Sequence, residues 1–303
     1  MNYFDLHCDT LYKCLVQNKS LISNDCELSF DKAEFFDNWV QCLAVWIPDE
    51  VRGERAVKTV EDCVVLLSKE IKKSNFVNHI QTVNEITAPY NVMLTLEGGA
   101  CLGGKIENVK RFRKLGARVM TLTWNGRCEL GDGALVENSD GLSEFGKNVV
   151  TEMEKCGIVV DVSHASDKLF YDVASIAKRP IIATHSNSRS VCPHERNLTD
   201  EQFQIIRNSG GVVGINFHKH FLSADNPSIK DIVKHTEYFL SLKGEDCVAV
   251  GSDFDGGELP SDITGVRDTA EIYDTFLQLN YSETLVDKLF FRNAYNFFQN
   301  FDN

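Results

Sequence analysis

Eight short apolar runs, most of them rich in β-branched residues, are spaced along this 303-residue chain. Amphipathic stretches with apolar residues at three- and four-residue spacing separate most of these runs. A buried parallel strand has a nearly continuous apolar sequence, and parallel neighbours need a crossover that is usually a helix. The alternation therefore predicts an α/β fold, a somewhat distorted (β/α)8 TIM-type barrel. The runs cover residues 2–7, 40–46, 91–97, 117–123, 157–163, 180–186, 211–217 and 247–253.

The expected helices carry recognisable end signals. Several run into a glycine or a proline, and Thr199 followed by Gln202 has the spacing of a capping box. A doubly wound open sheet is the rival fold, but no phosphate-binding glycine pattern follows any run. We expect one domain over residues 1–303 with C-terminal helices, and an active-site loop at 130–141. The expected helices cover residues 55–74, 106–116, 142–157, 165–180, 199–211, 228–244, 268–279 and 282–300.

Composition excludes some classes of function. The net charge of −13, from 44 acidic and 31 basic residues, argues against nucleic acid as a partner, because binding phosphates needs a basic face. Ten cysteines occur without a C-x-x-C pair, which favours free thiols in a reducing, cytoplasmic compartment. We expect neither a signal peptide nor a membrane span, since no run of 18 apolar residues occurs.

Ionisable residues gather where the expected strands end, which is where barrel enzymes build their sites. In the first run, "DLHCDT", His7 and Asp9 are two residues apart and so point to one face of a strand. Uncompensated charge converging at one rim is costly unless a cation holds it. The residues at these ends are His7, Asp9, Glu97, His164, His185 and Asp253, with Asp255 close behind.

This set of side chains suits two zinc ions, because imidazole and carboxylate are usual zinc ligands. His7 and Asp9 would hold one ion and His164 and His185 the other, with Glu97 as a bridge. Two such ions would bind and deprotonate a shared water, which would attack a polarised carbonyl. Asp253 is then free to act as a general base and to protonate the leaving amine.

Six collinear motifs together resemble the membrane dipeptidase (renal dipeptidase) family of the amidohydrolase superfamily. They span residues 3–256 and read "DLHCDT", "LTLEGG", "VVDVSH", "ATHSN", "CPHERNLTD" and "GSDFDG". The resemblance implies that His7, Asp9 and Glu97 bind one zinc, and that Glu97, His164 and His185 bind the other. It also implies that Asp253 is the acid/base residue and that Arg196 holds the α-carboxylate of the substrate, for which a guanidinium fork is well suited.

The resemblance further implies a dipeptide substrate, with a D-residue tolerated at the C-terminal position. Many family members are homodimers, and mammalian members carry a lipid anchor. This chain has no apolar C-terminal tail of the kind that such anchoring needs, so we expect no membrane attachment.

One residue departs from the family pattern. The family places a histidine that steadies the oxyanion after its fourth strand, where this chain reads "MTLTWNG" with Trp124. An indole N–H is a donor that cannot become cationic. We expect Trp124 to line the pocket and to narrow the substrate range toward small residues; its alternative role is to donate a hydrogen bond. In place of the family histidine, His218 or His220 in "NFHKH" would be the donor. The simpler expectation is that both are exposed loop histidines.

The favoured hypothesis is a zinc-dependent dipeptidase. The first alternative keeps the fold and metals but changes the substrate to another small amide, a lactam or an N-acyl amino acid. The second alternative is a non-catalytic, ligand-binding relative, for which Trp124 is the argument. Arg196 distinguishes the dipeptidase from the first alternative, because it predicts a free carboxylate on the substrate.

Overall fold

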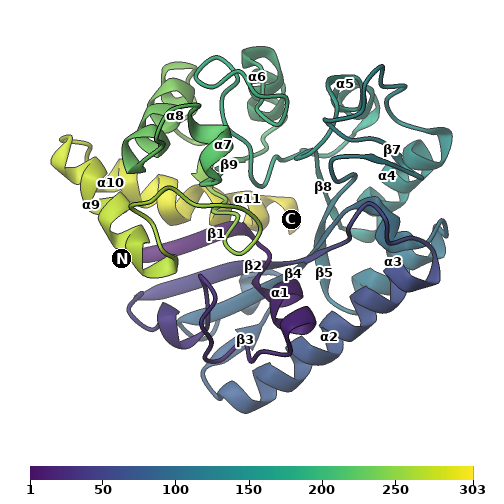
Figure 1. Ribbon diagram of the computed structural model, residues 1–303, viewed down its shortest axis with the longest axis horizontal. Helices are drawn as coiled ribbons and strands as arrows, with labels where there is room; N and C mark the ends of the chain where they lie inside the picture. The colour runs from purple at the N-terminus through teal and green to yellow at the C-terminus, as the bar shows by residue number, and fades with distance from the viewer. Residues whose placement is uncertain (303) are drawn as a thin grey trace.

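The computed structural model describes residues 1–302, and parallel pairing joins its central strands in the order β8-β5-β4-β2-β1-β10-β9 (Figure 1). A short additional strand, β3 (Val77–His79), pairs with the first half of β4. The strands on the main path are β1 (Asn2–Cys8), β2 (Asn38–Trp46), β4 (Tyr90–Glu97), β5 (Ala117–Thr121), β8 (Val159–Asp161), β9 (Val213–Ile215) and β10 (Val248–Val250).

The expected strand at 180–186 closes the ring without being a continuous strand. Ile182 bridges to Asp161 and Ala183 bridges to Val213, each as a single parallel bridge. The ladder is interrupted because the Thr184 N–H donates to the Asp161 side chain (3.0 Å) instead of to a neighbouring backbone. Eight parallel segments thus surround one axis, and the predicted TIM-type barrel is confirmed.

Helices pack around the ring and across one end of it (Figure 1). Gly157 ends α4 in the left-handed conformation, and Thr199 and Gln202 form the predicted capping box of α6. The last expected helix is divided by a π-helical turn at Lys288–Arg292. The helices are α1 (Thr10–Gln17), α2 (Glu54–Ser74), α3 (Glu107–Lys114), α4 (Glu144–Cys156), α5 (Asp167–Ile176), α6 (Asp200–Asn208), α7 (Lys219–Leu222), α8 (Ile229–Ser241), α9 (Thr269–Gln278), α10 (Glu283–Asp287) and α11 (Asn293–Asp302).

Two apolar clusters hold the barrel together. The larger one lies between strands and helices and extends from Tyr3 to Phe290. The smaller one contains alternate strand residues such as Phe4 and Leu6 together with aromatic residues of α11, and Phe298 stacks on Phe4 with ring centroids 5.5 Å apart. The α11 helix therefore covers the end of the barrel where the strands begin, leaving the other end for a site. Because the larger core is continuous along the chain, we propose that the protein forms one domain.

Among residues 1–302, the structure contains no helix with the length and apolar character needed to cross a lipid bilayer.

Candidate metal centre

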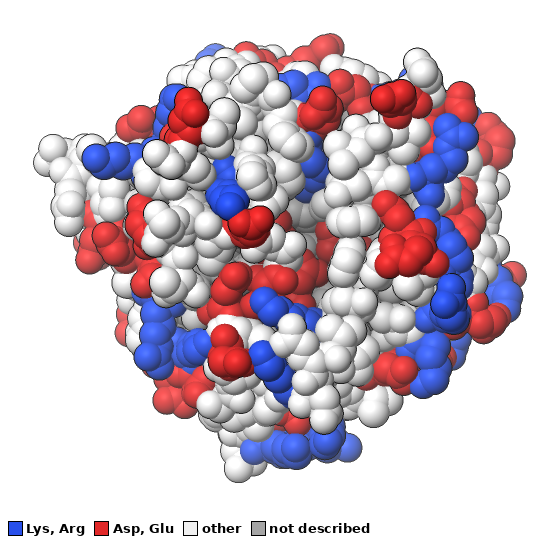
Figure 2. Space-filling model, in the orientation of Figure 1, with Lys and Arg blue, Asp and Glu red and all other residues white. Residues whose placement is uncertain are grey.

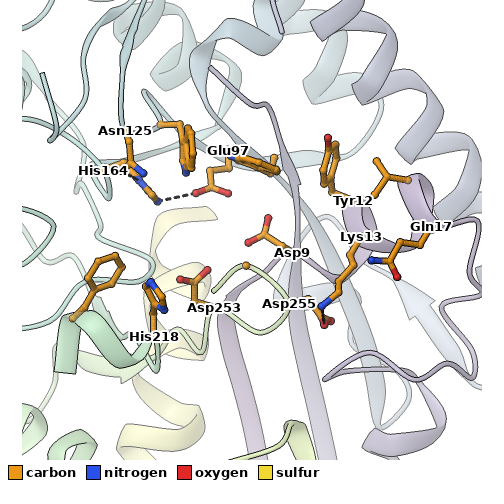
Figure 3. A pocket seen from close by; sticks show the side chains of 15 residues that line it. Asp9, Tyr12, Lys13, Gln17, Glu97, Asn125, His164, His218, Asp253 and Asp255 are labelled. Atoms are coloured by element: carbon orange, nitrogen blue, oxygen red, sulfur yellow. Dashed lines mark hydrogen bonds and ion pairs between the residues drawn. The ribbon is translucent and has the colours of Figure 1, made fainter. Parts of the chain in front are cut away.

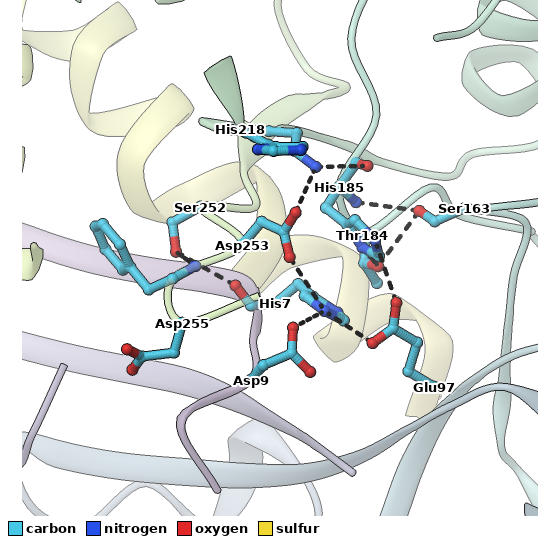
Figure 4. Close-up of polar contacts among 12 residues, drawn as sticks. His7, Asp9, Glu97, Ser163, Thr184, His185, His218, Ser252, Asp253 and Asp255 are labelled. Atoms are coloured by element: carbon cyan, nitrogen blue, oxygen red, sulfur yellow. Dashed lines mark hydrogen bonds and ion pairs between the residues drawn. The ribbon is translucent and has the colours of Figure 1, made fainter. Parts of the chain in front are cut away.

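The six ionisable residues predicted at the strand ends converge at one point, and all are more than nine-tenths buried. Figure 2 shows a hollow at the centre of this face with acidic side chains gathered in it. Glu97 lies in the middle of the group, with its Oε1 2.8 Å from His164 Nε2 (Figure 3). The same Oε1 is 3.6 Å from His185 Nε2, and Glu97 Oε2 is 3.5 Å from His7 Nε2 (Figure 4). His7 Nε2 is also 3.3 Å from Asp9 Oδ2.

The donor atoms form overlapping groups that share members. One group is His7, Asp9 and Glu97, and a second is Glu97, His164 and His185. Within each group the ligand atoms lie within 4.8 Å of one another. Asp253 joins His7 and His185 in a third group, with its Oδ1 3.8 Å from His7 Nε2. The first two groups have the composition that the sequence predicts for a pair of sites bridged by Glu97.

Local backbone irregularities aim these side chains. The register of β1 against β2 shifts between Asp5 and Cys8, and His7 lies within this shift. His164 and Asp253 both have a φ of 64°, a left-handed conformation that residues other than glycine seldom adopt. Gly256 follows closely, where a Cβ would lie 2.4 Å from Asp253 Oδ1. Such strained positions cluster at functional sites because the surrounding structure must hold them in place.

The residues present fit divalent cations. The Nε2 atoms of His164 and His185 lie 2.8 Å apart, and Asp9 Oδ1 is buried without a hydrogen-bond partner. His164 Nδ1 lies 2.8 Å from Asn125 Oδ1, an oxygen that only accepts, so Nδ1 carries the proton and Nε2 keeps its lone pair. A buried lone pair beside carboxylate oxygens is the donor arrangement that a metal requires.

Burial and neighbouring charges shift the pKa values of the group. Burial lowers the pKa of His164 and His185 well below the usual range, so both imidazoles are neutral, as metal ligation requires. Burial acts to lower the pKa of His7 as well, but the neighbouring carboxylates of Glu97 and Asp9 act more strongly in the other direction. The pKa of His7 is therefore raised well above its usual value. Burial raises the pKa of Asp253 to about 7, with Asp9 and Glu97 adding to the effect and His7 opposing it.

A cavity of ≈ 370 Å³ opens above the metal centre (Figure 3). The loop at 130–141 contributes nothing to its lining, so the expected active-site loop is wrong. This segment instead supports the site from behind, because the Ala134 N–H donates to the carbonyl of His164 (2.8 Å). The cavity is lined by Asp9, Tyr12, Lys13, Val16, Gln17, Trp46, Glu97, Trp124, Asn125, His164, His218, Phe221, Asp253, Asp255 and Gly256.

Arg196 is buried close to this centre without an ion-pair partner among residues 1–302. Its Nη2 donates to the carbonyl of His185 (3.3 Å), its guanidinium carbon lies 5.3 Å from the Phe221 ring centroid, and its Nε has no partner. Burial lowers the pKa of Arg196 to about 10, which leaves it charged at neutral pH. Asp253 and Glu97 favour the charged form of Arg196 from beyond ion-pair distance, so an anion in direct contact with the guanidinium would stabilise it further.

The three candidates for a donor to the oxyanion lie in different surroundings. Trp124 lines the cavity, with its ring centroid 5.0 Å from that of Trp46. His218 also lines the cavity, and its Nδ1 donates to the carbonyl of Glu258 (2.9 Å). His220 is exposed and absent from the lining. His220 is therefore exposed as expected but lies in α7, whereas His218 lies in a loop and is half-buried.

Sequence reasoning missed Asn125, Tyr12 and Trp46. For Asn125 and Tyr12 the signal was nearness to predicted site residues: Asn125 follows Trp124, and Tyr12 follows Asp9 by three residues. Trp46 gave no such signal, because its neighbour Glu97 is adjacent only through the pairing of β2 with β4.

Comparisons with known proteins agree with this geometry. The family model described as membrane dipeptidase (peptidase family M19) matches residues 1–303. The "uncharacterized protein in pqqA 5′ region" of Klebsiella pneumoniae is 36% identical over 209 residues, which cover 65% of this chain and 77% of that protein. A Rhodobacter sphaeroides metallo peptidase, solved with a phosphinate mimic of the dipeptide L-Ala-D-Ala, superposes with a TM-score of 0.91 at 25% identity, over 99% of each chain.

A second solved structure is a metallo peptidase named dipeptidase AC. It also has a TM-score of 0.91, at 26% identity, and the match covers 99% of this chain and 98% of that one. A whole-length family match together with these relatives shows the family. This chain belongs to the membrane dipeptidase family, peptidase family M19.

Proposed function

We propose that this protein is a metal-dependent dipeptidase that hydrolyses small dipeptides, including those with a D-residue at the C-terminal position. The observation that carries this proposal is the pair of donor groups sharing Glu97, with the unpaired Arg196 guanidinium nearby. The similar Rhodobacter sphaeroides enzyme was solved with a mimic of L-Ala-D-Ala, which supports the same substrate class here.

We propose two zinc ions for this centre, one held by His7, Asp9 and Glu97 and the other by Glu97, His164 and His185. Imidazole and carboxylate donors suit zinc, and Glu97 has one oxygen toward each group. When bound, the two ions would supply an activated water and polarise the scissile carbonyl. Asn125 would fix the ring of His164 through Nδ1, as hydrogen-bond partners of metal-binding histidines generally do.

Asp253 is proposed as the residue that moves the proton. Its Oδ2 accepts from the side chain of Asn216 (3.0 Å), which fixes the carboxylate, while its Oδ1 points toward the donor groups. A carboxylate in this place can accept a proton during attack and return it to the leaving amine. Asn216 also donates to the carbonyl of His185 (3.4 Å) and thereby ties the two strand ends together.

Arg196 is proposed to hold the C-terminal carboxylate of the dipeptide. Its buried, unpaired guanidinium would gain a charge-assisted contact only when an anion enters. Trp124 is proposed as a wall of the cavity, which it lines with its ring centroid 5.0 Å from that of Trp46. We further propose a cytoplasmic location, supported by ten cysteines that are all free. A homodimer stays a prediction.

The test is turnover of L-Xaa-L-Xaa and L-Xaa-D-Xaa dipeptides by the purified protein, together with elemental analysis of its metal content. The expected result is hydrolysis with two metals per chain. N-acyl amino acids and lactams belong in the same panel, because faster turnover of either class would favour the alternative substrates. Fewer than one metal per chain, unrestored by added zinc, would contradict the proposal.

A further inference from the structure

Three aromatic side chains form a continuous wall along one side of the cavity. Tyr12 meets Trp46 edge to face with ring centroids 5.2 Å apart, and Trp46 meets Trp124 with centroids 5.0 Å apart. All three line the cavity, and Val16 of α1 continues the apolar lining at the rim. We call Tyr12, Trp46 and Trp124 the aromatic wall.

Each residue of the aromatic wall is adjacent to a residue of the metal centre or to its hydrogen-bond partner, either along the chain or across the sheet. Tyr12 follows Asp9 by one turn of chain at the start of α1. Trp46 is the register partner of Glu97 in the pairing of β2 with β4. Trp124 precedes Asn125, which holds His164. The wall therefore begins directly beside the donor groups of the metal centre.

The direction in which a dipeptide binds decides which of its two residues contacts the aromatic wall. Arg196 lies on Phe221, whose ring packs against His218 with centroids 4.5 Å apart. His218 and Tyr12 lie on opposite sides of the central carboxylates (Figure 3). A dipeptide with its carboxylate toward Arg196 and its peptide bond at Glu97 thus places its N-terminal residue toward Tyr12.

We propose that the aromatic wall, with Val16, is the subsite for the side chain of the N-terminal residue and selects uncharged aliphatic side chains. This inference rests on the proposed function. The charged groups of the lining close to α1 are already paired, since Lys13 Nζ binds Asp255 Oδ1 (2.9 Å) and Thr10 Oγ1 donates to Asp255 Oδ2 (2.5 Å). Next to the wall, α1 contributes the apolar Val16 and the uncharged polar Gln17 to the lining. A cavity of ≈ 370 Å³ lies at the small end for ligand pockets.

The test compares kcat/KM for Leu-Ala, Gly-Ala, Lys-Ala and Glu-Ala, and for the reversed series Ala-Leu, Ala-Gly, Ala-Lys and Ala-Glu. The variant Val16→Asp places a carboxylate on the rim of the subsite. Val65→Asp is its matched control, because Val65 is similarly exposed (66% against 58% for Val16) and lies on α2 outside the cavity lining.

We expect the wild-type protein to prefer Leu-Ala over Gly-Ala, Lys-Ala and Glu-Ala by about tenfold or more, as an apolar pocket discriminates by the side chain it buries. Val16→Asp should lower kcat/KM for Leu-Ala several-fold more than kcat/KM for Gly-Ala, and Val65→Asp should leave all ratios as they are. A preference for Lys-Ala, or selectivity confined to the reversed series, would overturn the subsite while leaving the dipeptidase standing. A metal-loaded protein that hydrolyses no dipeptide would overturn both.

Discussion

Replacing Arg196 with methionine should weaken substrate binding without weakening the fold. Arg196 is only 4% exposed, its Nε is buried without a partner, and its pKa of about 10 keeps it charged at neutral pH. The folded protein therefore carries a buried charge that none of residues 1–302 neutralises by an ion pair at close range. A methionine of similar length removes this charge and retains a contact with the ring of Phe221.

The size of the effect follows from the contact that would be lost. A charge-assisted hydrogen bond contributes about 1.5–3 kcal/mol, and a factor of ten in affinity corresponds to about 1.4 kcal/mol. Arg196→Met should therefore raise KM for dipeptides by about 10- to 150-fold. Dipeptide amides have no carboxylate, so their KM should change much less. The melting temperature should stay level or rise, because methionine removes a charge that is buried without an ion-pair partner, and burying such a charge costs free energy.

Steady-state kinetics on a dipeptide and on its amide, with thermal unfolding of both proteins, measures all three quantities. Loss of the Arg196 hydrogen bond to the carbonyl of His185 should matter little, because Asn216 Nδ2 still donates to that oxygen (3.4 Å). Equal losses on the dipeptide and the amide, together with a melting temperature several degrees lower, would refute the reasoning. Arg196 would then be a structural residue.

Four further substitutions test the centre itself. Glu97→Gln should lose at least one metal by elemental analysis and nearly all turnover, because Glu97 is shared by both donor groups. Asp253→Asn should cut kcat by about 10²–10⁴-fold with metal content near normal, as for loss of a general acid/base; full turnover would contradict its role. Asn125→Ala should weaken metal affinity by about 10- to 100-fold in a chelator competition, since His164 loses its orienting partner. Trp124→Phe should shift substrate preference with little change in the best kcat; a loss of about 10²-fold or more would instead show that its N–H donates to the oxyanion.

The sequence alone determined the barrel and the set of residues at its rim. Apolar runs alternating with amphipathic stretches have few other solutions, because buried parallel strands need helical crossovers. Motifs at the ends of those runs identified His7, Asp9, Glu97, His164, His185 and Asp253 as one group, because strand ends of a barrel share one rim. Each of those motifs is only a few residues long, so it can be read directly from the chain.

Only the tertiary structure decided how these residues meet. The register shift in β1 that carries His7 and the left-handed conformations of His164 and Asp253 have no sequence signature, because His and Asp adopt such conformations only occasionally. The sequence at 180–186 predicts a continuous strand, but in the structure the Thr184 N–H donates to the side chain of Asp161 instead of to a neighbouring strand. Trp46 lies beside Glu97 through pairing between β2 and β4, which are separated by more than forty residues. Neighbours created by pairing across a sheet are invisible to periodicity, and for that reason the aromatic wall could be recognised only in the folded protein.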